Sequence, residues 1–244
     1  MNDFSQRLDK NRVMIESIID SYILADQTQK LLRPLIEDEI LLKLWQGTYA
    51  ADGVKVLRYS LYSHILSEIR AIMFDPDCKV ASVSNVMKSL DDEYFVKQLR
   101  AWFCDTSKHN VQSCDDSLSD ISIEYFRTLE KERREIAFEK LFIGVKESYT
   151  KLTDSTIHKR INAARCKMIS HKQVTSSGGA GRRVYSSEDF SLKYSDPEEI
   201  ISLTKEILQS LYSLFTIGYF DIKSGLHHNS MVAELFWSKC LTKS

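Results

Sequence analysis

The scarcity of glycine and proline constrains the fold of this chain more than any other feature of its sequence. Only 8 glycines and 3 prolines occur in 244 residues. β-sandwiches, β-barrels and doubly wound α/β sheets need a turn-forming residue about every ten positions. The shortage of glycine and proline therefore favours helices joined by short connections. Hydrophobic residues make up 43% of the chain, which is enough for a buried core. We therefore expect a single all-α domain over residues 1–244.

Apolar residues recur at helical spacing along most of the chain. Pro76 should end the third helix, because the residue before a proline disfavours the α conformation. Polar residues 104–122 and the glycine-rich segment 174–181 predict loops. We divide the domain into an N-terminal helix (1–34), a central bundle (35–220) and a C-terminal helix (221–244). The predicted helices cover about 8–25, 35–45, 56–73, 84–90, 92–103, 124–152, 156–172, 196–219 and 229–241.

Several functional classes are excluded by what the sequence lacks. It has no glycine pattern for a dinucleotide or a nucleoside triphosphate, and its five cysteines form no CxxC pair. His227 and His228 have no evident third metal ligand. No apolar segment is long enough for a membrane span, and no signal peptide is visible. We expect a cytoplasmic protein with reduced thiols, no metal, no cofactor and no membrane partner.

One segment carries most of the positive charge. Residues 151–183 contain eight lysines and arginines but one acid, Asp154, whereas the whole chain has a net charge of −1. Such a concentration favours a polyanionic partner, and a solvated helix face is the alternative. Within it, the predicted helix 156–172 has one apolar stripe, with Arg165 next to this stripe and His171 near its edge. The stripe consists of Ile157, Ile161, Ala164, Met168 and Ile169.

The segment 164–171, Ala-Arg-Cys-Lys-Met-Ile-Ser-His, resembles the R-x(4–6)-H motif of HEPN domains. Residues 61–90 resemble the abortive-infection U-like branch of that superfamily, and the whole resemblance spans about 35–214. It implies a helical bundle that forms a homodimer and acts as a metal-independent ribonuclease, often a toxin of antiviral defence. Two positions depart from the pattern. Cys166 stands where a polar residue is common, and Gln173 stands where some members have a modified tyrosine.

The resemblance implies that Arg165 and His171 are the catalytic residues. Histidine titrates near neutral pH and can act as general acid or base on the 2′-hydroxyl, while an arginine fork stabilises charge on the phosphorane. We expect Glu68 and Asp75 to orient this pair. Further basic residues are candidates for binding the substrate: Lys167, Lys172, His158, Arg182 and Arg183.

The spacing of the two catalytic candidates favours a site shared by two chains. Six residues of straight α-helix leave Arg165 and His171 about 120° apart and about 9 Å along the axis. One pair would converge poorly, whereas two copies around a two-fold axis could surround one cleft. We therefore expect an endoribonuclease of antiviral defence whose activity depends on the dimer. RNA is the expected partner, with an antitoxin or another defence protein as a further candidate.

Each of these assignments has a structural alternative. Arg165 could form a salt bridge with Glu68, His171 could cap the end of its helix, and Cys166 could be a packing residue. His158 could be a surface residue, and Arg182 and Arg183 could belong to an ordinary loop. The alternative function is a non-catalytic HEPN-like module that binds RNA, a nucleotide or a protein. A helical scaffold is a third class, in which the basic helix would play no part.

Overall fold

The computed structural model describes residues 3–107, 120–169, 186–218 and 220–241. Within these ranges every regular element is a helix, which confirms the all-α prediction. None of the described helices holds a stretch that is both long and apolar enough to cross a membrane. The α-helices are α1 (Asp3–Leu32), α2 (Pro34–Glu37), α3 (Glu39–Trp45), α4 (Ala50–Phe74), α5 (Val83–Leu90), α6 (Glu93–Cys104), α7 (Asp120–Asp154), α8 (Thr156–Ala164), α9 (Asp196–Thr216) and α10 (Ile222–Leu241).

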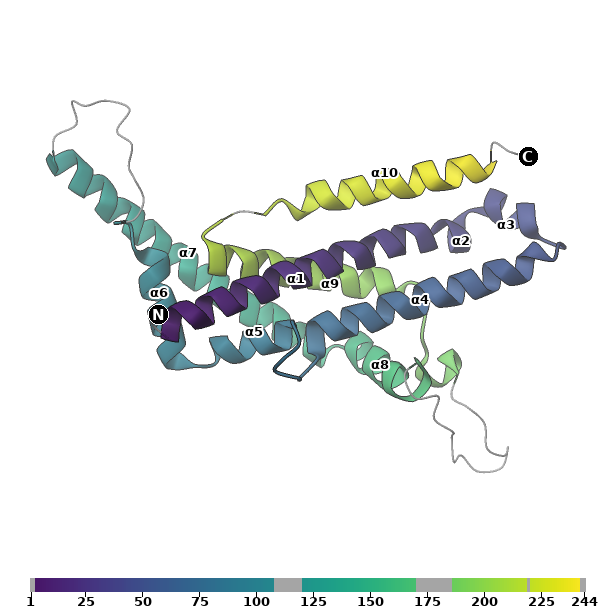
Figure 1. Cartoon of the computed structure of the whole chain (residues 1–244), viewed down its shortest axis with the longest axis horizontal. Coiled ribbons are helices and arrows are strands. Elements are labelled where there is room, and N and C mark those ends of the chain that lie inside the picture. Colours follow the sequence, from purple (N-terminus) through teal and green to yellow (C-terminus); the bar gives the residue numbers. More distant parts are fainter. Residues whose placement is uncertain (1–2, 108–119, 170–185, 219, 242–244) are drawn as a thin grey trace.

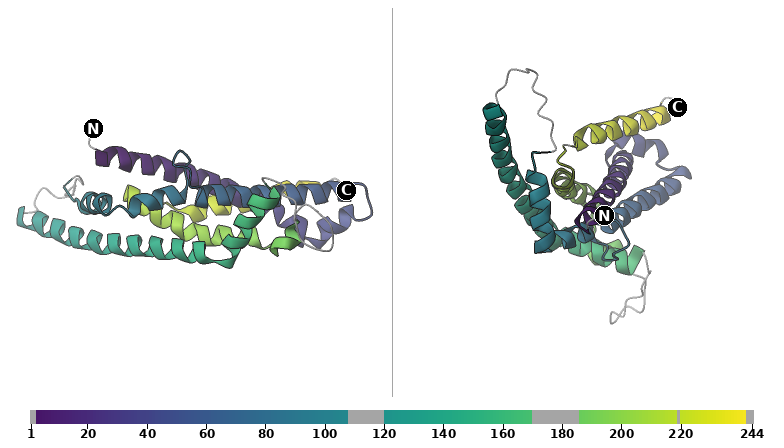
Figure 2. Two further views of the ribbon diagram at one scale, coloured as in Figure 1. Left: turned by 90° about the horizontal axis from the view of Figure 1, so that it is seen from below. Right: turned by 60° about the vertical axis from the view of Figure 1, so that its left-hand side comes forward.

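The first helix occupies the middle of an elongated bundle (Figures 1 and 2). Helix α1 packs against α4, α9 and α10, and α9 packs in turn against the long helix α7. The core lies between these helices, and the fully buried Tyr22 of α1 donates a hydrogen bond to the Ile201 backbone oxygen of α9, 3.2 Å away. The helix that begins the chain is therefore held from several sides.

Helices α1 and α10 run side by side in the same direction (Figure 1). The buried amide of Asn229 donates to Asp26 and to the Ile23 backbone oxygen, both at 3.0 Å. Further along, Trp237 Nε1 donates to the Leu31 backbone oxygen at 3.1 Å. The sequence predicts that this last helix starts at residue 229, but in the structure it starts at Ile222. The prediction places the start too late because the periodic pattern of apolar residues before Asn229 is weak.

Short polar side chains set most of the helix boundaries. Helix α4 ends at Phe74, before Asp75-Pro76 as predicted, and Ser82 and Ser155 accept the capping hydrogen bonds of α5 and α8. The prediction of a single helix over residues 35–45 is wrong, because this segment is divided at Asp38 into α2 and α3. The Asp38 carboxylate caps α3 by accepting hydrogen bonds from the backbone N–H groups of Ile40 and Leu41.

Candidate functional site

The basic helix predicted over residues 156–172 is described as far as residue 169, and this portion has two parts. Its first part, α8, begins after Ser155, whose hydroxyl accepts a hydrogen bond from His158 N at 3.2 Å. The α-helix ends at Ala164, and Arg165–Ile169 forms a π turn, η1. The prediction of one continuous α-helix is therefore wrong at the position where the catalytic arginine is expected. Wide turns of this kind are rare and are often found at functional sites.

The apolar stripe explains why the helix widens here. Five residues of α-helix would rotate Ile169 about 140° away from the buried Ala164. A π turn rotates each residue by about 82°, so Ile169 ends about 50° from Ala164. In the structure Ile169 packs against the main core and Met168 is buried. The π turn thus lets both residues contact the core, while Arg165 stays at the edge of the stripe, half-buried.

Helix α8 and the π turn lie antiparallel along α4. At one end the rings of Phe74 and His158 meet, with centroids 3.9 Å apart. One turn further, Arg70 Nε donates to Asn162 Oδ1 at 3.4 Å. His158, Asn162 and Arg165 follow at spacings of four and three, so they share one face of the helix. Arg165 therefore lies on the side of α8 and η1 that is turned toward α4.

A buried ion pair fixes α8 to α9. The carboxylate of Asp196, which is 1% exposed, accepts hydrogen bonds from Arg160 at 2.8 Å and from Lys193 N at 2.9 Å. The sequence predicts Asp196 as the N-cap of α9. The structure places Ser195 at the cap position, and Asp196 binds the basic helix instead. This contact keeps the segment that bears Arg165 at a fixed position on the bundle.

Buried side-chain polar atoms without a hydrogen-bond partner are concentrated on the elements that form this region. Six buried side-chain nitrogen or oxygen atoms among the described residues have no hydrogen-bond partner, and five of them belong to α4, α8 or η1. Buried polar groups are nearly always paired, so these atoms need partners from outside the described residues, such as water or an anion. The five are Arg58 Nε, Ser63 Oγ, His158 Nδ1, Arg160 Nε and Arg165 Nε.

The neighbourhood of His158 favours its neutral form. Burial lowers the pKa of the imidazole, and the nearby charges of Arg70 and Lys159 lower the pKa further. The ring is therefore uncharged at neutral pH and can donate or accept a hydrogen bond, but it adds no positive charge. Its contact with Phe74 excludes the plain surface role that the sequence left open.

The two predicted orienting residues lie on or next to α4. The Asp75 carboxylate is 3.4 Å from Arg70, so within the described residues its partner is Arg70 rather than Arg165. Glu68 is half-buried, and no ion pair joins it to Arg165 in this part of the chain. The salt bridge considered as the alternative role of Arg165 is thus absent. The orienting role of both acids stays a prediction.

The remaining sequence candidates divide into two groups. Lys167 is exposed on the π turn and Cys166 is half-buried with a free thiol. His171, Lys172, Arg182 and Arg183 lie outside the described residues. Within the described ranges no three His, Cys, Asp or Glu side chains gather closely enough to hold a metal ion.

Sequence reasoning missed the residues through which α4 and α9 contact this site. Arg70, Asn162 and Asp196 contact the basic helix or belong to it, and the sequence analysis assigns none of them to the site, Asp196 being predicted only as a helix cap. The spacing of His158, Asn162 and Arg165 is a signal that could have identified Asn162. Nothing in the sequence indicates that Arg70 faces α8, because that contact joins residues 92 positions apart.

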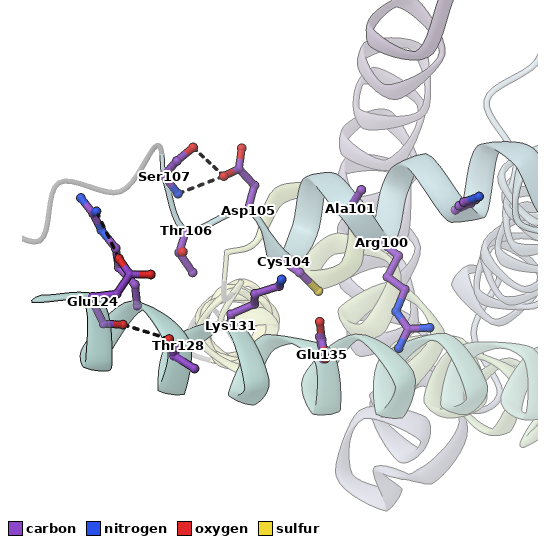
Figure 3. A pocket seen from close by; sticks show the side chains of 12 residues that line it. Arg100, Ala101, Cys104, Asp105, Thr106, Ser107, Glu124, Thr128, Lys131 and Glu135 are labelled. Carbon is purple, nitrogen blue, oxygen red and sulfur yellow. Dashed lines mark hydrogen bonds and ion pairs between the residues drawn. The ribbon is translucent and has the colours of Figure 1, made fainter. Parts of the chain in front are cut away.

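A large hollow lies elsewhere in the described structure, between α6 and α7 (Figure 3). Its volume is about 830 Å³, and four basic side chains face three acidic ones. Burial and Glu135 raise the pKa of Cys104 in its wall, so this thiol is protonated and a weak nucleophile. Mixed charge and an unreactive cysteine give this hollow no evident chemistry, in contrast to the donors around Arg165.

The chain was compared with known proteins at the level of family, sequence and structure. A family model described as AbiU2, within the HEPN group, matches residues 4–236. No curated protein and no solved structure matches the chain.

Proposed function

Because the chain belongs to the AbiU2 branch of the HEPN superfamily, we propose that it is a metal-independent endoribonuclease that acts in antiviral defence. Arg165 stabilises the charge on the scissile phosphate, and His171 is the general acid or base for the 2′-hydroxyl and the leaving group. Lys167, Lys172, Arg182 and Arg183 supply further positive charge toward the RNA backbone.

One observation supports this proposal most strongly. Among the residues that the structure describes, most buried side-chain polar atoms without a hydrogen-bond partner lie on α4, α8 and the π turn, and Arg165 Nε is one of them. An RNA phosphate offers several acceptor oxygens and a negative charge, and arginine binds it through two parallel hydrogen bonds. Neutral His158 adds a hydrogen-bonding group to the same face without adding charge. The site is thus suited to an anion with many acceptors.

The proposal is tested by incubating purified protein with total RNA in the presence of a chelator. The wild type should produce fragments that end in a 2′,3′-cyclic phosphate, and Arg165→Ala and His171→Ala should each produce none. Arg133→Ala and His228→Ala are matched controls, because both side chains are exposed and lie on α7 and α10. Thermal unfolding checks that every variant is folded. Unchanged cleavage by His171→Ala would refute the assignment.

The composite site across a dimer needs a separate test. Mixing Arg165→Ala with His171→Ala protein produces heterodimers in which one chain keeps the arginine and the other keeps the histidine. If the two residues act across the two-fold axis, the mixture should recover up to about a quarter of the wild-type activity. A mixture that stays inactive although native mass spectrometry detects heterodimers would contradict a shared site.

The second candidate function is a non-catalytic module that binds RNA. Cys166 favours it, because the residue after the motif arginine is polar in the pattern that the chain resembles. Such a module would bind RNA and leave it intact in the incubation above. Its binding should weaken steeply with salt, and Arg165→Ala should reduce the salt slope by about one.

A further inference from the structure

A small hollow lies directly beside the π turn. It has a volume of about 100 Å³, and its wall joins α4 and η1 to the chain segment that precedes α9. Aromatic and aliphatic groups dominate this wall, with one lysine at its edge. The principal lining residues are Tyr59, Tyr62, Met168, Leu192, Lys193 and Tyr194.

The three tyrosines in this wall differ in exposure. Tyr62 is 6% exposed and is fixed by a hydrogen bond from its hydroxyl to the Lys193 backbone oxygen, 3.1 Å away. The Tyr194 ring meets the Tyr62 ring edge to face, with centroids 5.5 Å apart. Tyr194 and Tyr59 are about half exposed, at 51% and 54%. One ring therefore forms a rigid floor, and two rings remain open to a ligand.

The hollow is close to the proposed phosphate site. Met168 lies three residues after Arg165 in the same π turn, and Tyr62 lies four residues after Arg58 on one face of α4. Both arginines carry an unpartnered buried Nε atom. Lys193 adds an exposed ammonium group at the edge of the hollow. The open aromatic faces and the two arginines thus belong to the same two adjoining elements, α4 and η1, and to the segment before α9 that lines the hollow with them.

We propose that this hollow binds one unpaired base of a single-stranded RNA whose neighbouring phosphate lies on Arg165. The proposal rests on the function proposed above and adds a base-binding subsite to it. Bases that are splayed out of single strands stack on aromatic side chains, and this contact tolerates any base because each has a π-face. The hollow of about 100 Å³ is smaller than the roughly 150 Å³ cavity that encloses a benzene ring, so the base lies partly outside it, against the exposed rings of Tyr59 and Tyr194.

The test uses Tyr194→Leu and Tyr59→Leu, which remove a ring but keep an apolar side chain. The control is Tyr94→Leu on α6, where the tyrosine is somewhat more exposed, at 67%, and does not line the hollow. A fluorescent six-nucleotide single-stranded RNA in chelator is the probe, and inorganic polyphosphate is the competitor without bases. Stacking contributes about 1–3 kcal/mol per base, so each variant should lose roughly 5- to 150-fold in RNA affinity. Polyphosphate binding should not change.

A second measurement locates the base directly. An oligonucleotide with one 5-iodouridine is irradiated with the wild type, and the crosslinked peptide is identified by mass spectrometry. A crosslink to Tyr194 or Tyr59 supports the subsite, whereas crosslinks only to tyrosines elsewhere overturn it.

The outcomes separate this inference from the proposed function. If Arg165→Ala weakens RNA binding while both tyrosine variants bind like Tyr94→Leu, the base subsite fails and the phosphate site stands. If the wild type binds no RNA at all, both proposals fail. Equal losses for RNA and polyphosphate in Tyr194→Leu would also overturn the subsite, because stacking does not act on phosphate.

Discussion

Replacing Asp196 with alanine should destabilise the protein and loosen the helix that carries Arg165. The Asp196 carboxylate is buried and accepts hydrogen bonds from Arg160 of α8 and from Lys193 N. Asp196→Ala would leave the Arg160 guanidinium without a partner and the Lys193 N–H without an acceptor. Since Asp196 holds α8, through Arg160, against the start of α9, its loss should loosen both elements.

The size of the effect follows from how far water can replace the lost contacts. Removing one partner of a fully buried pair costs about 3–5 kcal/mol, because a buried charge is left unpaired. The Arg160 side chain is 28% exposed, so water compensates part of that cost. An unsatisfied backbone N–H adds about 1 kcal/mol. We expect a total of about 2–3 kcal/mol, which is a fall in Tm of about 4–12 °C for a chain of this size.

Thermal and urea unfolding of four variants beside the wild type would test this reasoning: Asp196→Ala, Asp52→Ala, Arg160→Met and the double variant of residues 160 and 196. Asp52→Ala removes an exposed aspartate that pairs with Lys55 on α4, and it should cost under about 1 kcal/mol. In an Arg160→Met background, Asp196→Ala should cost at most about 1 kcal/mol. It leaves the N–H of Lys193 without an acceptor, but it also removes a buried carboxylate that has already lost its cationic partner. If Asp196→Ala unfolds within 1 °C of the wild type, the buried pair does not anchor α8.

Three further predictions concern other parts of the bundle. Ser82→Ala should cost about 2 kcal/mol in urea unfolding, because this buried hydroxyl caps α5 and also donates to the Asp75 backbone oxygen. Phe138→Ala should cost about 3–5 kcal/mol, because it opens a cavity in the core between α6 and α7, and differential scanning calorimetry would measure it. Burial lowers the pKa of His158, so the unfolded chain binds more protons and stability should fall as the pH drops below about 6.5. His158→Gln should flatten that loss between pH 7 and 5 in unfolding measurements, whereas His64→Gln, at an exposed position of α4, should leave it unchanged.

The helices were predictable where local signals agree. Ser82, Asp92 and Ser155 each precede an apolar periodic run, and each caps a helix in the structure. Errors occur where tertiary contacts dominate. The sequence around Asp196 is typical of a helix cap, but its side chain is buried and binds Arg160 instead. Asp38 ends one helix and caps the next within an apolar run, where no glycine or proline signals a break.

The candidate site was predictable only in part. The basic helix and Arg165 could be selected from charge and motif spacing, because both are local properties of the sequence. The π turn could not, because it depends on which side of the helix the core occupies. The contact of Arg70 with Asn162 and the contact of Tyr62 with Lys193 in the tyrosine hollow each join residues about 90 to 130 positions apart, so no local sequence pattern reveals them.

The position of α1 has a consequence for how the protein matures after synthesis. This helix is made before the other described elements, yet the side chains that enclose it include Asn229 and Trp237, some 200 residues later. Contacts of such long range form slowly, and these cannot form until the ribosome has made α10. Newly made molecules therefore pass through a stage in which the central helix is only partly covered, and a truncation before α10 should leave them open to proteases and chaperones.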